Sequence, residues 1–439
     1  MADAPPRWGD QEARFEYGRS LRDKVRRVDH DEWPTGPRDV MARLKPSERG
    51  RIPEMLAVRY QKMSASPFAY LRGNAWVMAP DLAQLPVTGY KVQICGDAHV
   101  RNLGAYAAQD GRVVFDVNDF DETCMAPFEW ELTRLAISIV VVGREAGSSE
   151  STVRDAVRAM VREWRETMET LSELPVVELA RYCVHRFASG DTVGQVIRNA
   201  ERVTSVEAVG EMTEEVNGRP RFVENPGKLH RIPDDEAAGV LAALGAYRDT
   251  LGPNRQQVLD CYEPYDVAFK IAGTGSVGAK NYVVLCNGNG PEDPLLLQVK
   301  EALPSCYAQL GLVDVAPGVH EGKRVAEGQH RMQTWTDPFL GWTMLDGHPC
   351  YVRQIADHQS SIDPKELRRG ALVAYAAVCG ETFAKAHARS GDPCVLSGYA
   401  GRAEKLDNAL ADRAAAGADQ VEADWKELCT ALPRSVLHR

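Results

Sequence analysis

Residues 94–122 read ICGDAHVRNLGAYAAQDGRVVFDVNDFDE, and no other stretch of the chain carries as many groups suited to chemistry. Asp97 and Asn102 lie in a segment punctuated by glycines, and a predicted strand over 113–117 follows a predicted turn at Gln109-Asp110-Gly111. Four acids gather at the end of that strand and just beyond it: Asp116, Asp119, Asp121 and Glu122.

This acidic stretch offers the oxygen ligands that a hard divalent cation prefers. Mg²⁺ is usually held by one or two carboxylates, and water and substrate phosphate complete its shell. A further carboxylate would remain to orient a hydroxyl group and accept its proton. Asp, Asn and Gly also crowd ordinary turns, because their side chains bond the local backbone. The acids outnumber what two turns require, so the stretch predicts a magnesium and phosphate site.

Length, charge and cysteine spacing restrict the class of protein. A chain of 439 residues suggests two or three packed subdomains, and its net charge of −10 argues against a broad nucleic-acid interface. The ten cysteines contain no CxxC pair, which argues against zinc ribbons and disulfide frameworks. No apolar run approaches the roughly 18 residues that a membrane span needs. We therefore expect a soluble cytoplasmic protein without membrane or nucleic-acid partners, and the oligomeric state stays open.

A second motif, GTGSVG over 273–278, lies between predicted strands. Its glycine spacing matches GxGxxG, but the following residues, 281–286, predict a strand and not the helix that a dinucleotide-binding unit requires. A glycine-rich hairpin laid over nucleotide phosphates remains compatible with this context. Lys300 ends the apolar strand 295–299, where a lysine needs a partner such as a phosphate.

Several other residues admit both a functional and a structural interpretation. The predicted helix 319–334 supplies Glu321 and Glu327 as partners for Lys300, although Glu327 could equally form a surface pair with Arg331. Arg72 could bind phosphate or act structurally, and His387 could be catalytic or packed in the core. Further elements are predicted as helices over 127–147, 150–171, 234–251, 365–389 and 402–432, and as a hairpin over 339–355 with an Asp-Gly turn.

GDAHVRN followed by a strand and NDFDE resembles the catalytic loop and metal-binding segment of the aminoglycoside phosphotransferase and choline kinase group, whose pattern is HGDxHxxN and then I-D-F-D/E. GTGSVG, Lys300 and the glutamate-bearing helix resemble the small lobe of the same enzymes. In this chain the segment that resembles the catalytic loop (94–122) precedes the segment that resembles the small lobe (265–355), which is the inverse of the order in those enzymes. The resemblance therefore implies an α+β, protein-kinase-like two-lobe fold in circularly permuted order, with four parts: a polar N-terminal arm (1–50), a helical catalytic lobe (51–255), a β-rich nucleotide lobe (256–360) and C-terminal helices that complete the catalytic lobe (361–439).

The whole motif set is also similar to the bacterial family catalogued as domain of unknown function 2252. The motifs that carry this likeness are SPFAYLRG, CGDAHVRNLG, FDVNDFDET, PFEW, GTGSVG, LQVKEA, EGQ and AHARSGD. They extend from about Arg59 to the C-terminal helices. The family name implies no activity, so the expected activity comes from the kinase resemblance alone.

That resemblance implies a role for each matching residue. Asp97 would be the catalytic base, Asn102 and Asp119 would bind magnesium, and Asp121 or Asp116 would hold a second ion. Lys300 would contact phosphate and pair with Glu327, and the loop residues Gly273, Gly275, Ser276 and Gly278 would cover the phosphates. The chain departs from the HGDxHxxN pattern at Cys95, where the aminoglycoside phosphotransferase and choline kinase group has histidine. The interval from Asp97 to Asp119 is also longer than in that pattern, which leaves Asp116 a rival metal ligand.

The expected activity is ATP-Mg²⁺-dependent transfer of a phosphoryl group to the hydroxyl of a small molecule. The alternatives are a nucleotide-binding pseudokinase or regulatory module, a protein-directed kinase and a nucleotidyltransferase. A metallophosphoesterase is a weaker alternative, because GDAH lacks the further histidine motif that such a site needs. The sequence leaves open the acceptor and the choice between ATP and GTP.

Overall fold

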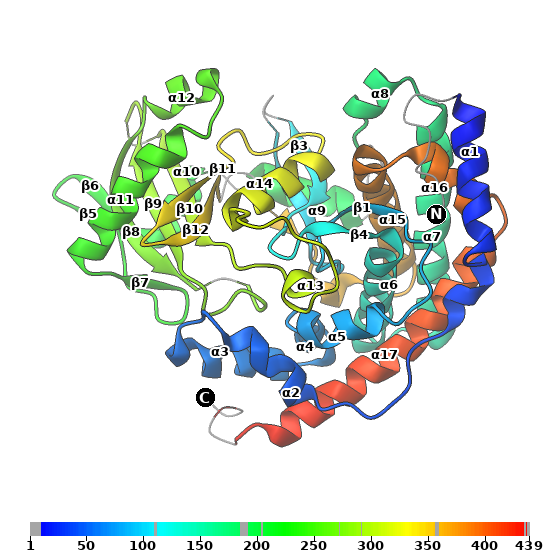
Figure 1. The fold of residues 1–439 in the computed structure, drawn as a ribbon. Coiled ribbons are helices and arrows are strands. Elements are labelled where there is room, and N and C mark those ends of the chain that lie inside the picture. Colours follow the sequence, from blue (N-terminus) through cyan, green and yellow to red (C-terminus); the bar gives the residue numbers. More distant parts are fainter. Residues whose placement is uncertain are drawn as a thin grey trace.

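The computed structural model describes residues 10–108, 112–184, 192–202, 205–271, 273–290, 292–355, 360–433 and 436. The protein is α+β, with a large antiparallel sheet at one end and a group of long helices at the other (Figure 1). In the described ranges, no helix has both the length and the apolar character needed to cross a membrane.

The elements agree with most of the predicted ones. The α-helices are α1 (Gln11–Ser20), α2 (Val40–Leu44), α3 (Pro53–Ser64), α4 (Pro67–Leu71), α5 (Ala75–Leu82), α6 (Phe128–Glu145), α7 (Glu150–Glu173), α8 (Val176–Arg181), α9 (Thr192–Arg202), α10 (Ser205–Met212), α11 (Asp234–Arg248), α12 (Pro253–Leu259), α13 (Cys306–Gln309), α14 (Glu321–Met332), α15 (Gly370–Ser390), α16 (Pro393–Ala400) and α17 (Lys405–Ala431). Short 3₁₀ helices are η1 (Leu21–Asp23), η2 (Arg27–Asp31), η3 (Lys45–Glu48) and η4 (Pro364–Glu366). The strands are β1 (Lys91–Ile94), β2 (Leu103–Ala107), β3 (Val113–Val117), β4 (Cys124–Pro127), β5 (Thr213–Val216), β6 (Arg219–Phe222), β7 (Leu229–Arg231), β8 (Glu263–Lys270), β9 (Asn281–Asn287), β10 (Pro294–Glu301), β11 (Gly341–Leu345), β12 (His348–Gln354) and β13 (Ser360–Ser361).

The large sheet has six antiparallel strands in the order β11-β12-β10-β9-β8-β7. Side chains alternate between its two faces. Leu297 and Val299 of β10 belong to the apolar cluster under α11, whereas Leu296 belongs to the cluster that includes Val209 of α10. Lys300 follows the same alternation and therefore projects from the face opposite α11.

The glycine-rich segment joins β8 to β9 as an antiparallel hairpin, as its sequence context predicted. The Asp-Gly turn between β11 and β12 is confirmed too, with Asp346 and Gly347 both at positive φ. One boundary differs from the prediction. Residues 205–248, expected in the helical part, pack on the sheet, because β7 pairs with β8 and α11 covers one face.

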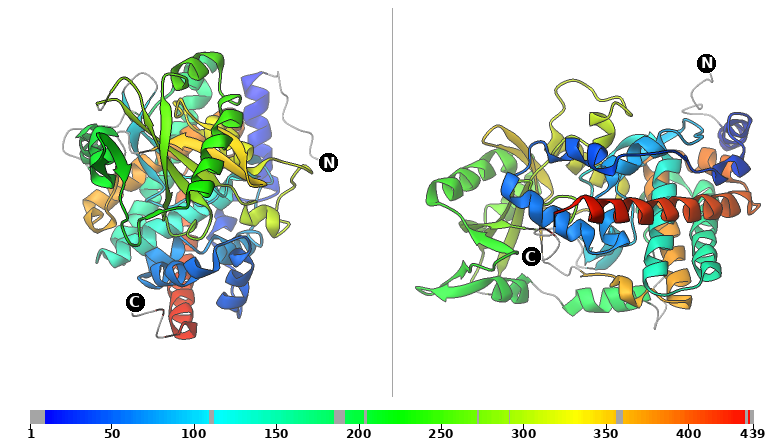
Figure 2. Two further views of the ribbon diagram at one scale, coloured as in Figure 1. Left: turned by 90° about the vertical axis from the view of Figure 1, so that its left-hand side faces the viewer. Right: turned by 90° about the horizontal axis from the view of Figure 1, so that it is seen from below.

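The helical end of the molecule is built around α6, α7, α15 and α17, and buries most of its side chains in one large core. Figure 2 shows α17 as a long helix along one side of this group. The N-terminal segment also differs from the expected polar arm. Leu21, Val40 and Leu44 are buried in the same core, so residues 10–50 are packed against the helices.

Two small sheets lie between the ends of the molecule and hold the acidic stretch. β1 pairs with β4, and β2 pairs with both β3 and β13. The predicted strand 113–117 is confirmed as β3. The predicted turn at Gln109-Asp110-Gly111 lies outside the described residues. These pairings place the start and the end of residues 94–122 beside each other.

Candidate active site

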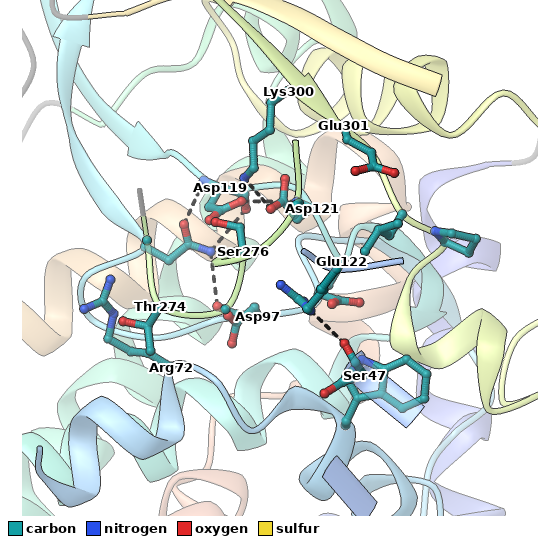
Figure 3. A pocket seen from close by; sticks show the side chains of 18 of the residues that line it. Ser47, Arg72, Asp97, Asp119, Asp121, Glu122, Thr274, Ser276, Lys300 and Glu301 are labelled. Atoms are coloured by element: carbon teal, nitrogen blue, oxygen red, sulfur yellow. Dashed lines mark hydrogen bonds and ion pairs between the residues drawn. The ribbon is translucent and has the colours of Figure 1, made fainter. Parts of the chain in front are cut away.

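A cavity of about 420 Å³ lies between the large sheet and the helical part, and residues far apart in the sequence line it. Asp97, Asn102, Asp119 and Asp121 come from the acidic stretch; Gly273, Gly275 and Ser276 come from the glycine loop; and Lys300 comes from β10. Figure 3 shows Lys300 at one end, Asp97 at the other, and Asp119 and Ser276 between them. The acidic stretch, the glycine loop and Lys300 therefore line one cavity.

Helix α6 anchors the loop that carries Asp97. Glu131 accepts hydrogen bonds from the backbone N–H groups of Cys95 (2.8 Å) and Gly96 (3.2 Å). Its other oxygen lies 2.9 Å from Nε2 of His387, and Trp164 donates to Nδ1 of that histidine (3.2 Å). Because Nδ1 accepts, Nε2 must carry the proton that it donates to Glu131. His387 is fully buried, so its core role is the one that the structure displays.

Asp97 is held by a buried arginine that the sequence analysis missed. Arg134 donates to Oδ1 of Asp97 through Nε (2.9 Å) and through a short contact from Nη2, and it also donates to the carbonyl of Leu71 (2.7 Å). Both contacts use the same carboxylate oxygen. Oδ2 is therefore left toward the cavity, 3.9 Å from Nε2 of His99. Glu131 and Arg134, two charges three residues apart in an apolar helix, were the available signal.

Asn102 connects the two acidic segments. Its Nδ2 donates to the carbonyls of Asp97 (3.1 Å) and Asp119 (3.1 Å), and its Oδ1 accepts the N–H of Asp119 (2.7 Å). These three bonds fix the orientation of the amide, since only the nitrogen can donate to carbonyls. Asn102 thus sets the distance between the Asp97 loop and the acids that follow β3. Its Oδ1 keeps a second lone pair beyond the one that accepts the N–H of Asp119.

Lys300 pairs with Asp121 inside the cavity, with Nζ 2.5 Å from Oδ2. Tyr351 donates to the other carboxylate oxygen of Asp121 (3.1 Å). Burial acts to raise the pKa of Asp121, but Lys300, Arg353 and the hydrogen bond from Tyr351 together outweigh it and leave the pKa below the usual value. Burial likewise opposes the charge of Lys300, yet Asp121, Tyr351 and Asp119 raise its pKa. The pair is therefore ionised.

Asp119, together with Glu122, whose carboxylate accepts the N–H of Cys306, carries negative charge of the cavity that no ion pair of the described residues offsets. Asp119 forms no ion pair with any described residue, and burial together with the neighbouring Asp121 raises its pKa. Its side chain is solvent accessible, but the surrounding cavity wall still desolvates it. A cation placed beside Asp119 would offset this unmatched charge.

Three predicted site residues, Asp116, Glu327 and Gly278, do not line the cavity. Asp116 is buried and forms a short ion pair with Lys385 of α15, so it faces the core and cannot compete with Asp119. Glu327 is half-exposed and lies near Lys323 (3.6 Å) and Arg331 (3.8 Å). The predicted Lys300–Glu327 pair is wrong for this structure, and the surface alternative is the observed one.

Glu321 does not reach Lys300 either. It forms a short pair with Arg324, and Arg324 donates to the backbone carbonyls of Thr123 (2.6 Å), Asp121 (2.9 Å) and Leu303 (2.9 Å). Helix α14 therefore contacts the acidic stretch through an arginine and its supporting glutamate. Sequence reasoning missed Arg324 because its partners are backbone groups of distant segments.

The glycine loop reaches across the cavity to the catalytic loop. A Cβ on Gly275 would lie 3.1 Å from the carbonyl oxygen of Arg72 and 4.0 Å from Oδ2 of Asp97, so a side chain there would crowd the site. Gly278 does not line the cavity. Its carbonyl accepts the N–H of Ile52 (2.7 Å), and it anchors the far end of the loop at positive φ.

Comparison with known families adds one finding. Residues 51–431 match the family model described as an uncharacterized protein conserved in bacteria, DUF2252. The chain belongs to the DUF2252 family. The predicted membership is confirmed, and every predicted site residue lies inside the matched range. No curated protein and no solved structure matches this DUF2252 chain.

The donor set of this DUF2252 site suits Mg²⁺ better than a soft metal. Among the described residues, no three His, Cys, Asp or Glu side chains converge on one point. The carboxylate of Asp119 and the amide oxygen of Asn102 are hard ligands of the kind that hold Mg²⁺ when phosphate and water supply the rest. The residues therefore fit a magnesium ion that arrives with a phosphorylated ligand.

Proposed function

We propose that this protein transfers a phosphoryl group from ATP-Mg²⁺ to a hydroxyl group of a small molecule. The observation that carries the proposal is the single cavity in which the glycine loop and Lys300 face Asp97 and Asp119. Phosphoryl transfer depends mainly on positioning and on neutralising charge, and these groups are of the types that supply both.

We also propose that the chain is a circularly permuted kinase-like fold. The support is the order of elements from 263 to 354. A strand, a glycine loop and a second strand (β8, β9) precede the lysine strand β10, helix α14 and the hairpin β11–β12. The small lobe of protein kinases has a glycine-rich loop followed by the β3 lysine and helix αC. Here the acidic stretch precedes these elements in the chain.

In the proposed reaction Asp97 has the role of general base. The acceptor oxygen forms a bond to the γ-phosphorus, the bond from that phosphorus to the β–γ bridging oxygen breaks, and the hydroxyl proton moves to Oδ2 of Asp97. Arg134 holds the other oxygen, so the free oxygen has a fixed direction. Mg²⁺, bound by Asp119 with Asn102, would supply charge neutralisation at the phosphates.

Lys300 and the glycine loop have the role of holding phosphate. The ammonium group has three donors, and Asp121 takes one of them, so the others remain for phosphate oxygens. Asp121 is then a positioning residue for Lys300, in the place where the sequence analysis expected Glu327. This difference is also the observation that favours the second candidate, a nucleotide-binding pseudokinase, since α14 supplies no glutamate to the lysine.

The test begins with binding. Calorimetric titration of ATP into the intact protein should show saturable binding that depends on Mg²⁺, and Asp119→Asn should weaken the Mg²⁺-dependent part about tenfold or more. Asp314→Asn, an exposed surface acid, is the matched control. Absence of Mg²⁺-dependent ATP binding would overturn the proposal.

The products then separate the candidate reactions. The protein is incubated with ATP, Mg²⁺ and a set of small hydroxyl compounds, and the products are identified by mass spectrometry. A phosphorylated acceptor with ADP supports the proposal, and an AMP adduct with pyrophosphate indicates nucleotidyl transfer. Binding without turnover of any acceptor, by protein that is fully folded, indicates the pseudokinase.

A further inference from the structure

The cavity wall contains more cations than the proposed nucleotide site uses. Six basic side chains line it: Arg49, Arg51, Arg72, Arg101, Lys300 and Arg353. Lys300 pairs with Asp121, and Arg353 donates to Gln298 (2.9 Å) and to the carbonyl of Asn118 (3.0 Å). Arg51 donates to the carbonyls of Ser47 (2.7 Å) and Val277 (2.6 Å). Three arginines, Arg49, Arg72 and Arg101, have uses that remain to be explained, and two of them, Arg72 and Arg101, lie close enough for their charges to interact.

These two arginines lie at the Asp97 end of the cavity. Arg101 follows Asp97 by four residues, and Arg72 caps the C-terminus of α4 beside the glycine loop. Figure 3 shows Arg72 next to Thr274 and Asp97, and Lys300 at the opposite end. Within the described ranges neither guanidinium forms an ion pair or donates a hydrogen bond, and Nε of Arg72 is buried without a partner.

Positive charge therefore accumulates around Asp97. Arg134 already pairs with the Asp97 carboxylate, and among the described residues no acid forms an ion pair with Arg72 or Arg101. Burial and the charge of Arg101 lower the pKa of Arg72, and the charges of Asp97 and Asp119 offset only part of this. Burial, Arg72, Arg134 and Arg101 together depress the pKa of His99, which stays neutral between them. An anion placed here would offset the repulsion and satisfy the open donors.

We propose that Arg72 and Arg101 form an oxyanion-binding subsite beside Asp97, and that the hydroxyl acceptor therefore carries a phosphate or carboxylate group. Guanidinium groups bind such oxyanions through paired N–H donors. The inference rests on the proposed function, because it places the acceptor hydroxyl at Oδ2 of Asp97. The nucleotide phosphates already have Lys300 and the glycine loop at the other end, so the anion at this end belongs to the acceptor.

A binding experiment tests the subsite without knowledge of the acceptor. The intact protein is saturated with Mg²⁺ and the non-hydrolysable analogue AMP-PNP, and inorganic phosphate or acetate is titrated by calorimetry. At least one of these anions should bind the wild-type complex. The double variant Arg72→Ala/Arg101→Ala should weaken that binding about tenfold or more while changing the AMP-PNP affinity less than about threefold. Arg162→Ala, an exposed arginine of α7 outside the cavity, should leave both unchanged.

The outcomes separate this inference from the proposed function. Loss of AMP-PNP affinity in the double variant would assign the arginines to the nucleotide and overturn the inference alone. Anion binding that persists in the double variant, or is absent from the wild type, would also overturn it. Failure of the wild type to bind AMP-PNP with Mg²⁺ would overturn both. If the double variant does not fold, Arg72→Lys/Arg101→Lys keeps the charges but loses the fork geometry, and it should weaken the anion binding in the same way.

Matched acceptors then identify the oxyanion. Glycerol, glycerate and glycerol 3-phosphate offer similar hydroxyl groups with no anion, a carboxylate and a phosphate. We expect kcat/KM for one anionic compound to exceed that for glycerol about tenfold or more, and we expect the double variant to remove this preference through KM. A kcat/KM for glycerol equal to that for both anionic compounds would contradict the subsite.

Discussion

Two lysine–aspartate pairs lie at either end of the segment that includes β3 and the acids after it, and they differ in surroundings. Lys385 and Asp116 face the core, where their side chains are 1% and 5% exposed. Lys300 and Asp121 face the cavity, where the exposed fractions are 6% and 28%. The same two residue types therefore serve a core contact and a candidate active site a few residues apart.

The charge balance of the two pairs differs as well. Burial lowers the pKa of Lys385, which has Asp116 as its acidic partner and Arg389 nearby. The pKa of Lys300 is raised despite burial, because both Asp121 and Asp119 act on it. The core pair thus has an additional base, Arg389, beside it, while the cavity pair has an additional acid, Asp119, together with the base Arg353. That unmatched Asp119 is what makes the cavity side suited to a metal and a phosphate.

For the cavity side, the largest effect on turnover is expected from a substitution of Asp97. Asp97→Asn should lower kcat by about 10²–10⁴-fold, because the amide cannot accept the hydroxyl proton, while the Kd for ATP-Mg²⁺ changes little. Steady-state turnover and calorimetry measure the two quantities. The amide oxygen can still accept from Arg134, and circular dichroism checks that the fold is kept. Near-normal turnover would remove Asp97 from the reaction.

Replacing each of the two lysines with methionine tests the difference between the pairs. Lys385→Met should lower the free energy of unfolding by about 3–5 kcal/mol, because it leaves the buried Asp116 charge without a partner. Lys300→Met should cost about 1–2 kcal/mol, since cavity water can solvate Asp121, but it should weaken ATP-Mg²⁺ binding about tenfold or more. Guanidinium chloride unfolding and calorimetry provide both values.

The double variant Lys385→Met/Asp116→Asn provides the control for the core pair. It removes both charges, so it should be more stable than Lys385→Met alone. An equal loss of stability in the single and double variants would mean that packing, and not charge, accounts for the effect. Tight ATP-Mg²⁺ binding by Lys300→Met would show that the cavity pair is structural like its counterpart.

Patterns local in sequence predicted much of this arrangement. The hairpin around GTGSVG, the strand that ends at Lys300 and the Asp-Gly turn follow from glycine positions and strand periodicity, which nearby residues determine. The partners of the charged groups could not be predicted in this way. Lys385 and Arg134 reach Asp116 and Asp97 only through tertiary packing, and the rotation of α14 about its axis decides that Glu327 faces solvent.

A third buried acid, Glu129, shows what happens when no described residue forms an ion pair with the carboxylate. Glu129 accepts bonds from the N–H (2.7 Å) and hydroxyl (2.6 Å) of Thr88, and its other oxygen has no partner in the described structure. Burial raises its pKa from 4.5 to about 7, although the Thr88 bonds oppose this. The folded state therefore prefers the protonated acid. Its stabilising contribution is complete below pH 4.5 and is lost as the pH rises through about 7.

Glu129→Gln should remove this pH dependence. The free energy of unfolding of the variant minus that of the wild type should increase by roughly 2.5 kcal/mol between pH 5 and pH 8.5, since each pKa unit corresponds to about 1.4 kcal/mol. Guanidinium chloride unfolding across that range measures the difference. A difference that is constant with pH would mean that Glu129 is ionised in the folded protein, as Asp121 is.

The smallest expected effect concerns the acid that the kinase resemblance would have paired with Lys300. Glu327→Gln should change the free energy of unfolding by less than about 0.5 kcal/mol and leave ATP-Mg²⁺ affinity unchanged, because its contacts with Lys323 and Arg331 are exposed to solvent. Glu321→Gln is the comparison on the same helix. It loses the buried contact to Arg324 that anchors the backbone of Asp121, so it should be more destabilising. Suppose that Glu327→Gln instead weakened ATP-Mg²⁺ binding about tenfold. This result would require α14 to turn toward Lys300 when the nucleotide binds. Asp121 would then be the partner of Lys300 only before binding.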